Sequence, residues 1–585
     1  MTSEKELPLH VGRDKRTIRR AHHFGVISLI LIVLLFVTFS YNDNVKSLMD
    51  APHEPDSLCP IIPKINPSKY LTNPETLQYI LHNKKYHKQI RKRLSNAVKI
   101  PTEIYDDMIN PSNIESLEEL YKLDPRWEQF EKFQKFLKKT YPLIHKHLKL
   151  KKINKFGLIY TWKGSDETKK PIMLAAHQDV VPVSLETESQ WKYPPFGGEF
   201  DGEFIYGRGV SDCKNLLMAL MNTIELLLKE GDFKPKRTII LSFGYDEEAS
   251  GNGAKEISEY LLNKYGENSI FQIIDEGDNE GITEIEGIKF ILPSIGEKGH
   301  LNSIIELFTK GGHLSIPPKH TSIGILAELI TIIENNQFNP ILSNINPIMN
   351  QLYCLAQHSS TLDKSLKSNI LKSQLDEKAN EKVVNYLMSN EETEYLIKSS
   401  QAVDIINGGI KSNALPDHVS MLINSRISID QSSISIIEKF KQDILKITSK
   451  YNLGFILNNK EIIPIDSTNG YFNYTINEVL EPAPISPIDG KSWEIYSGSL
   501  RYLFEDLIFP SNDSSIIVSP CLAIGNTDTK SYWGLSENIY RYQPNINSKN
   551  SNIHTINEKL LFEGHLQIMS FYYFYLQVID NIDEL

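Results

Sequence analysis

The feature that most constrains the fold is an alternation of short apolar runs with longer helical patterns between residues 155 and 275. The runs GLIYTW, PIMLAAH, TIILSFGYD and IFQIID have the length of strands, and KNLLMALMNTIELLLKEG has helical periodicity. Strand–helix–strand alternation builds βαβ units with parallel strands. Runs such as IMLAA and IILSF are apolar throughout, as expected when helices cover both faces of a sheet. We therefore predict an α/β domain with a mainly parallel central sheet.

Composition excludes several classes of protein. The chain has 585 residues, of which 41% are hydrophobic and 23% are charged, so it is long enough to bury a large core. Its net charge of −11 argues against a dedicated nucleic-acid binder, which usually presents a basic face. Four cysteines are too few for a scaffold held together by disulfides. Hydrophobic burial must therefore stabilise the fold.

Residues 24–41 form an apolar run, FGVISLILIVLLFVTFSY, that contains no charge. As a helix this run would rise about 27 Å, which is enough for a thin bilayer. Basic residues precede it, among them Lys15, Arg16, Arg19 and Arg20. The positive-inside rule then predicts a cytosolic tail at 1–23 and a body across the membrane. We predict an uncleaved transmembrane signal anchor, with a cleaved signal peptide and a buried core helix as alternatives.

The rest of the chain divides into segments that differ in composition and in predicted secondary structure. Residues 42–75 are rich in proline and polar residues and are typical of an extended lumenal stalk. Residues 76–296, helical at first and then alternating, are predicted to be the first part of a catalytic domain. Residues 297–455 combine amphipathic strands with helices, which predicts an inserted α+β domain. The strand–helix alternation resumes after residue 490, and residues 456–585 are predicted to complete the catalytic domain.

Candidate functional side chains follow three of these apolar runs. His177 and Asp179 come after the second run, Glu247 and Glu248 after the third, and Asp275 ends the fourth. A further carboxylate, Asp212, lies in a glycine-containing turn that opens a helix. Parallel sheets collect their functional groups at the carboxyl ends of strands. Each residue alone has an ordinary explanation, such as a helix cap or a turn, but their recurrence predicts one site.

These residue types suit a divalent metal. One imidazole and several carboxylates, without a thiolate cluster, fit Zn²⁺ or a similar ion. His177 and Asp275 are each suited to hold one metal, and Asp212 has two oxygens with which to bridge a pair. Of Glu247 and Glu248, one is suited to ligate while the other takes a proton from a water.

Longer stretches carry a resemblance to a known family. They are WKYPPFGGEFDGEFIYGRG at 191–209, GRGVSDCK, DEEASG, IDEG, GGHLSIPPKHTSIG at 311–324, INGGIKSNALPD at 406–417, GNTDTKSYWGLSENIYRY at 525–542 and IHTINE. The chain resembles the co-catalytic dizinc metallopeptidases that include aminoacylase and glutamate carboxypeptidase. It is most similar to their branch of fungal vacuolar Gly-X carboxypeptidases, over about residues 75–585. The resemblance implies a zinc-exopeptidase-like catalytic domain with a lid and dimerisation domain inserted at 297–455.

The resemblance also implies roles for single residues. His177 and Asp275 correspond to the ligands of one zinc ion, and Glu248 and His554 to those of the other. Asp212 corresponds to the bridging carboxylate, Glu247 to the general base and Asp179 to the group that orients His177. The implied cofactor is two Zn²⁺ per subunit.

Roles outside the metal site follow from the same resemblance. His313, with His320 as the fallback, corresponds to a lid histidine that polarises the scissile carbonyl and that the partner subunit supplies in dimeric relatives. Asn413 corresponds to a lid asparagine that assists the oxyanion. Arg426 and the loop at Gly525 correspond to groups that bind the terminal carboxylate of the substrate.

The resulting expectation is a membrane-anchored carboxypeptidase in the vacuolar lumen, with short peptides as substrates and a possible homodimer. The alternatives are an N-acyl-amino-acid hydrolase with the same dizinc site and a non-catalytic lumenal binding module. Sequons predict glycosylation at Asn473 and Asn512. Cys59, Cys354 and Cys521 are candidates for disulfide pairing, without a connectivity, and Cys213 is not assigned to the metal.

Overall fold

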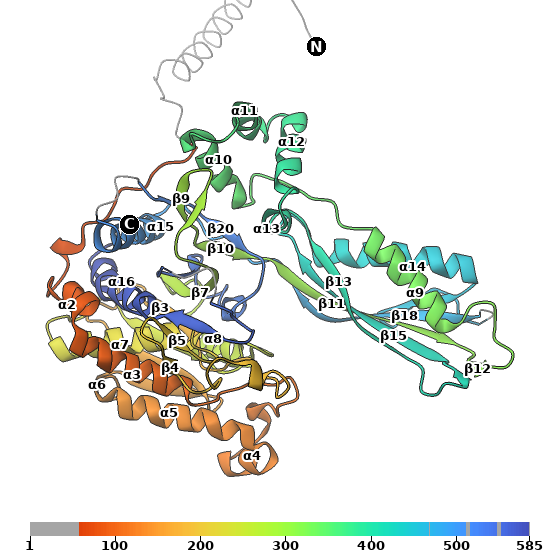
Figure 1. Cartoon of the computed structure of the whole chain (residues 1–585), viewed down its shortest axis with the longest axis horizontal. Coiled ribbons are helices and arrows are strands. Elements are labelled where there is room, and N and C mark those ends of the chain that lie inside the picture. Colours follow the sequence, from red (N-terminus) through yellow and green to blue (C-terminus); the bar gives the residue numbers. More distant parts are fainter. Residues whose placement is uncertain (1–57, 467–468, 511–514, 547–550, 584–585) are drawn as a thin grey trace, which may run out of the picture. The chain divides into compact units, whose positions relative to one another are not determined.

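A computed structural model describes residues 58–466, 469–510, 515–546 and 551–583 (Figure 1). The predicted cytosolic tail, the anchor at 24–41 and most of the stalk lie outside these residues, as does Asn512. Among the helices that the structure describes, none is both long enough and apolar enough to span a bilayer. Residues 1–60 and 61–585 form two separate units, and the fold below belongs to the second.

The larger sheet has eight strands. Their order is β1 (Lys149–Ile153), β2 (Gly157–Trp162), β6 (Ile239–Gly244), β3 (Ile172–His177), β7 (Gln272–Glu280), β21 (Ile539–Gln543), β10 (Ser294–Glu297) and β20 (Cys521–Ala523). The neighbours β3–β6, β3–β7, β7–β21 and β10–β20 are parallel, whereas β1–β2, β2–β6 and β10–β21 are antiparallel.

This sheet is therefore mixed, and our prediction of a mainly parallel sheet was wrong in that respect. The cause is local at one end, where β1 and β2 form a hairpin. Asn154 and Lys155 in its turn both have positive φ, and so short a connection permits only an antiparallel pair. The βαβ units that we predicted supply the parallel centre of the sheet.

Helices cover both faces of the eight-stranded sheet, as its apolar strands predicted. On β3, Leu174 belongs to the same buried cluster as α7 (Lys214–Glu230) and α16 (Phe562–Asp580). Its neighbour Met173 belongs to a second cluster with α8 (Asn252–Tyr265), because side chains alternate between the faces of a strand. The first residues of this unit form α2 (Thr76–His82), α3 (Lys84–Val98), α4 (Leu117–Leu123), α5 (Glu128–Thr140) and α6 (Pro142–His147), and α15 (Lys491–Tyr502) follows later.

Two three-stranded sheets flank this arrangement. One contains β4 (Glu199–Phe200), β5 (Phe204–Tyr206) and β22 (Lys559–Leu561), and the other contains β8 (Thr283–Ile285), β9 (Ile288–Ile291) and β19 (Ile517–Val518). The pairing of β22 with β5 joins segments about 350 residues apart in sequence. This pairing brings the loop that contains His554 next to the turn that contains Asp212.

The predicted lid contains a six-stranded sheet. Its order is β13 (Ser400–Gly408), β15 (His418–Ile427), β11 (Gly299–Thr309), β18 (Gly470–Leu480), β16 (Gly454–Leu457) and β17 (Lys460–Ile463). Helices α9 (Ser322–Asn335) and α14 (Ser433–Tyr451) pack on one face through residues such as Leu329 and Phe440 (Figure 1). A separate pair, β12 (Gly312–His313) with β14 (Ala414–Leu415), extends from this sheet.

The six-stranded sheet continues beyond our predicted boundary at residue 455. Because β18 pairs with β11 and β16, residues 456–480 belong to this sheet and not to the returning catalytic segment. The charged segment 361–400 is largely helical, as expected, and belongs to a helical insert between α9 and β13. The insert contains α10 (Ile348–His358), α11 (Lys364–Lys372), α12 (Glu377–Leu387) and α13 (Glu391–Glu394).

Candidate metal centre

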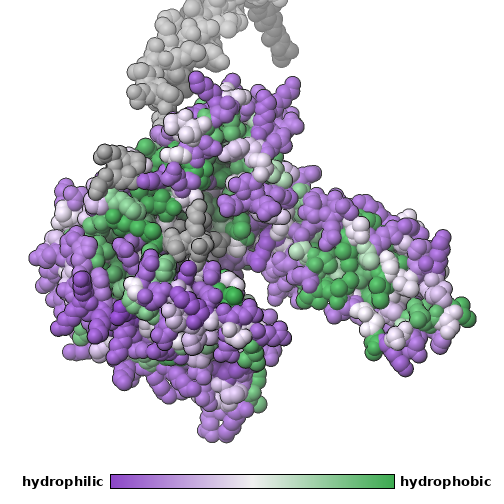
Figure 2. All heavy atoms as spheres, viewed as in Figure 1, coloured by the Kyte–Doolittle hydropathy of each residue, from purple (hydrophilic) through white to green (hydrophobic). Residues whose placement is uncertain are grey.

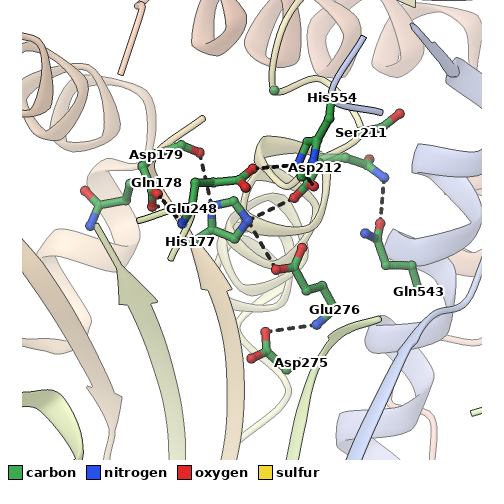
Figure 3. A network of polar contacts seen from close by, with 12 residues as sticks. His177, Gln178, Asp179, Ser211, Asp212, Glu248, Asp275, Glu276, Gln543 and His554 are labelled. Atoms are coloured by element: carbon green, nitrogen blue, oxygen red, sulfur yellow. Dashed lines mark hydrogen bonds and ion pairs between the residues drawn. The ribbon is translucent and has the colours of Figure 1, made fainter. Parts of the chain in front are cut away.

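The predicted residues converge at the carboxyl ends of β3, β6 and β7 (Figure 3). His177 is the last residue of β3, and Asp275 lies within β7. Glu247 and Glu248 lie in the turn between β6 and α8, and Asp212 lies just before α7. Potential ligand atoms of His177, Glu247 and Glu248 lie within 4.8 Å of one another, as do those of Asp212, Glu248 and His554, and Asp275 belongs to neither group.

His177 anchors the first group. Its Nδ1 donates a hydrogen bond to the backbone carbonyl of Asp179 at 3.0 Å, and the Asp179 carboxylate lies 3.3 Å away. Its Nε2 therefore faces the site, where it lies 3.0 Å from Asp212 Oδ1 and 3.2 Å from Glu276 Oε1. This arrangement fixes the ring so that Nε2 points at a space that carboxylates surround.

His554 anchors the second group. Its Nε2 lies 2.9 Å from Asp212 Oδ2 and 3.0 Å from Glu248 Oε1. The Glu248 backbone N–H donates to Asp179 Oδ2 at 3.0 Å, so Asp179 contacts both groups. The two oxygens of Asp212 thus face different imidazoles, which is the arrangement that a bridging carboxylate requires.

The structure brings Glu276, rather than Asp275, to His177. The two residues are adjacent on β7, and consecutive side chains of a strand point to opposite faces. Asp275 Oδ1 instead accepts a hydrogen bond from the Glu276 backbone N–H at 2.9 Å, and Figure 3 shows that the Asp275 carboxylate lies farther from His177 than that of Glu276. Sequence reasoning missed Glu276, although the IDEG motif offered both residues and the alternation of β7 was the signal that could separate them.

The charge of this cluster fits a bound cation. Burial raises the pKa of Glu276 to about 8. The charge of His177 lowers this pKa, and the nearby Asp212 carboxylate raises it further. Burial and the Asp212 charge also raise the pKa of Glu248, although His554 opposes them. Several acids crowded around two imidazole nitrogens are costly to bury without a compensating positive charge. The nitrogen and oxygen donors suit Zn²⁺ or a similar divalent ion, and their two groups suit two such ions.

Glu247 lies beside this donor set. It shares a group of potential ligand atoms with His177 and Glu248. Burial raises the pKa of Glu247 well above its ordinary value, and the Glu276 and Glu248 carboxylates add to this effect against His177. A carboxylate whose pKa is raised toward neutrality is suited to accept a proton and to return it.

The predicted lid residues lie at the extended β12–β14 pair and are not among these groups. His313 is exposed, and its Nδ1 accepts a hydrogen bond from the Ser315 backbone N–H at 3.2 Å. Asn413 is also exposed, and its backbone carbonyl accepts a hydrogen bond from the Leu314 backbone N–H. The two predicted residues are therefore close to each other, because His313 pairs with Ala414. The fallback residue, His320, is also exposed.

Arg426 lies at the other end of the six-stranded sheet and contacts the predicted substrate loop. Its Nη1 donates to Asn526 Oδ1 at 2.8 Å, next to Gly525. The amide of Asn526 donates in turn to the Lys298 carbonyl at 2.7 Å. Burial, with the charges of Arg426 and Lys398, lowers the pKa of Lys298 to about 7. The structure thus joins Arg426 to the loop at Gly525 through Asn526, in positively charged surroundings.

Comparisons with known proteins show the family of this chain. The model of peptidase family M20/M25/M40 matches residues 173–577. The chain belongs to this family. It is 40% identical to Carboxypeptidase S of Saccharomyces cerevisiae, over 97% of this chain and 96% of the relative. It is 31% identical to the N-fatty-acyl-amino acid synthase/hydrolase PM20D1 of Bos taurus, over 77% of this chain and 82% of the relative. The structure of the dipeptidase Dug1p of Saccharomyces cerevisiae has a TM-score of 0.57 at 15% identity and covers 88% of this chain and 100% of its own.

The remaining predicted residues of this M20 peptidase are placed as follows. Cys59 and Cys354 are each disulfide-bonded, whereas Cys213 and Cys521 are buried and do not belong to a disulfide. Cys213 lies in a group with His177 and Glu276. Asn473 lies in β18, where its side-chain amide donates to Glu306 Oε2 at 2.9 Å.

Proposed function

We propose that this chain is a zinc-dependent carboxypeptidase that releases C-terminal amino acids from short peptides of the Gly-X type. The observation that carries the proposal is the position of Asp212, whose two oxygens face His177 and His554 at 3.0 and 2.9 Å. This arrangement supports two ions that share one carboxylate. Membership of the M20 family, whose peptidases are metal-dependent, supports the same conclusion.

The donor set supports two Zn²⁺ per subunit. His177, Asp212 and Glu276 would hold one ion, and Asp212, Glu248 and His554 would hold the other. Glu276 takes the place that we predicted for Asp275, because its carboxylate lies 3.2 Å from His177. When bound, the two zinc ions supply Lewis acidity toward the scissile carbonyl and a water that loses its proton near neutral pH.

Glu247 then acts as general base and general acid. It takes the proton of the attacking water and passes it to the leaving amine. Asp179 orients His177. It also accepts a hydrogen bond from the Glu248 backbone N–H, which holds the His177 and His554 groups in position relative to each other. His313 polarises the scissile carbonyl, and Asn413 assists the oxyanion, once they reach the cluster.

Arg426 and the Gly525 loop bind the free α-carboxylate of the substrate. A guanidinium recognises a carboxylate through parallel charge-assisted hydrogen bonds. The hydrogen bond from Arg426 to Asn526 supports this role, because it orients the Arg426 guanidinium toward the loop. Such a clamp explains a preference for the last peptide bond of a chain.

A second candidate is an N-acyl-amino-acid hydrolase with the same dizinc site. The 31% identity to PM20D1 of Bos taurus, whose name describes fatty-acyl amino acids, favours this alternative. Both reactions break an amide bond next to an amino acid with a free carboxylate, so they differ only in the acyl group. A non-catalytic binding module is the least favoured alternative, because Glu247 and a full set of ligands are present.

The six-stranded sheet supports a homodimer. On α9, Ile323 is 46% exposed, and on the edge strand β13, Ile406 is 57% exposed. Ile323 lies near Gly408, so helix and strand form a continuous apolar face, and Figure 2 shows apolar residues gathered over α9. An exposed apolar face beside an unpaired strand edge suits a second copy of the chain. The partner would bring its exposed His313 to this subunit's metals.

A vacuolar lumenal location is the third part of the proposal. The disulfide-bonded Cys59 and Cys354 support an oxidising compartment, because cytosolic thiols are kept reduced. The apolar run at 24–41 supports a single-pass type II anchor, and the Asn473 sequon supports glycosylation in that compartment. The chain would then be a membrane-bound precursor.

The experiment that tests the function compares three substrates with purified full-length protein in detergent and added zinc. We expect release of leucine from benzyloxycarbonyl-Gly-Leu, and loss of this activity with a chelator. Faster release from N-acetyl-leucine or N-oleoyl-leucine would favour the acylase alternative. No turnover of any of the three, with zinc bound, would favour the binding module.

A further inference from the structure

Glu558 is a fully buried carboxylate that none of the roles above uses. It lies four residues after His554 and directly before β22. Its Oε1 accepts hydrogen bonds from the backbone N–H groups of Ser211 at 3.0 Å and Asp212 at 3.4 Å. Its Oε2 accepts from the Gly209 backbone N–H at 3.0 Å and from Arg208 Nη1 at 2.8 Å. One side chain thus satisfies four donors of a single turn.

The turn that Glu558 holds is the one that carries the bridging carboxylate. Gly209 has a φ of +78°, and a Cβ at this position would lie 2.1 Å from Val180 Cγ1, so the turn has little room to shift. The backbone adds two bonds across the same junction. The Gly207 N–H donates to the Glu558 carbonyl at 2.9 Å, and Ser211 Oγ donates to the Lys559 carbonyl at 3.0 Å.

This network joins two metal-binding segments that are far apart in the sequence. Asp212 and Glu558 are separated by 346 residues, and His554 lies in the loop that Glu558 ends. Asp212 Oδ2 and His554 Nε2 lie 2.9 Å apart, so a small movement of either segment would separate them (Figure 3). Because the Glu558 side chain binds the Asp212 backbone while its own backbone continues from His554, it sets the distance between them.

We propose that Glu558 is a positioning residue for the second metal ion, the one that Asp212, Glu248 and His554 would hold. The inference rests on the proposed dizinc site and adds a residue to it. Glu558 touches neither substrate nor metal and acts through the turn at 208–212. Substitutions of residues that orient metal ligands typically weaken metal affinity by about 10–100-fold. The first ion keeps His177 and Glu276, so it should be affected less.

Glu558→Gln is the direct test. We would strip the full-length protein of metal and titrate it with zinc in competition with a chromophoric chelator, so that two dissociation constants are read without any substrate. We expect the weaker-bound ion of Glu558→Gln to lose about 10–100-fold in affinity while the other stays within a few-fold. Glu563→Gln, an exposed change at the start of α16, is the matched control and should bind as the wild type does.

Loss of the fold must be separated from loss of position. Glu558→Gln leaves the buried Arg208 without its charged partner, which is costly in itself. The double variant Arg208→Gln, Glu558→Gln removes both charges, and we expect it to show the same selective loss while unfolding near the wild-type temperature. Wild-type affinity for both ions, or an equal loss for both, would overturn the proposed role. A wild-type protein that takes up no zinc would instead contradict the proposed function.

Discussion

The metal cluster and the β12–β14 pair differ in how much of their geometry this chain fixes. The side chains around His177 and Asp212 are largely buried, and backbone hydrogen bonds orient them. His313 and Asn413, which we expect to complete the same reaction, are exposed and lie at a short two-stranded extension. On the proposed mechanism, a single chain would organise its metal ligands in advance, whereas its lid residues would need closure or a partner to reach them.

The largest expected effect follows from removing a ligand that the structure, and not the sequence, singled out. We expect Glu276→Gln to lose one zinc ion and to reduce hydrolysis to the level of chelator-treated enzyme, because its carboxylate faces His177. Asp275→Asn should keep both ions, because its carboxylate lies farther from His177 than that of Glu276 (Figure 3). Zinc content of the two variants after dialysis is the measurement. The reverse pattern would restore Asp275 as the ligand.

The next effect separates chemistry from metal binding within the buried cluster. Glu247→Gln should lower kcat by about 10²–10⁴-fold, because a general acid–base typically contributes that much. Both zinc ions should remain, since other residues hold them. Glu259→Gln, an exposed change on α8, is the control. Retained turnover in Glu247→Gln would remove it as the base.

His313→Ala tests the role of the exposed β12–β14 pair. Loss of a group that stabilises the oxyanion typically costs about 10²–10³ in kcat, and we expect a loss of this size without loss of zinc. His320→Ala should have little effect. Mixing His313→Ala with Glu247→Gln should restore part of the activity if the partner subunit supplies this histidine. No restoration in proven mixed dimers would mean that the histidine acts in its own subunit.

A smaller effect is expected where the six-stranded sheet contacts the Gly525 loop, at Arg426. Arg426→Ala should raise KM by about 10–100-fold, because hydrogen bonds to charged groups contribute about 1.5–3 kcal/mol. Arg426→Lys keeps the charge and should lose less. Initial rates over a range of benzyloxycarbonyl-Gly-Leu concentrations separate KM from kcat. An unchanged KM in Arg426→Ala would move carboxylate recognition elsewhere.

The smallest effect is expected at Asn473. Asn473→Gln should reduce the apparent mass of the protein from its native host and leave kcat/KM unchanged, because Asn473 contacts Glu306 in the six-stranded sheet and not the metal cluster. Mass spectrometry before and after glycosidase treatment is the measurement. An unchanged mass would show that this sequon is not used.

The sequence predicted the parts of the site that short-range patterns encode. Apolar strands followed by acids located His177, Asp212 and the two glutamates at one edge of the sheet. It did not separate Asp275 from Glu276, because only the register of β7 decides which of two neighbours faces the site. His554 came from family resemblance, since its approach to Asp212 depends on the pairing of β22 with β5.

The fold was predictable to a similar extent. The βαβ units and the inserted sheet followed from periodicity, but the boundary at residue 455 did not, because β16 and β18 pair with strands from elsewhere in the sequence. Glu558 carries no local signal either. Its four hydrogen bonds all go to a turn about 350 residues earlier.

The most direct test of the account is a crystal structure of the zinc-loaded protein with data collected on both sides of the zinc absorption edge. We predict two anomalous peaks about 3.5–4 Å apart, one in contact with His177 and Glu276 and the other with Glu248 and His554, with Asp212 between them. A single peak, no peak, or a first ion bound by Asp275 without Glu276 would contradict it.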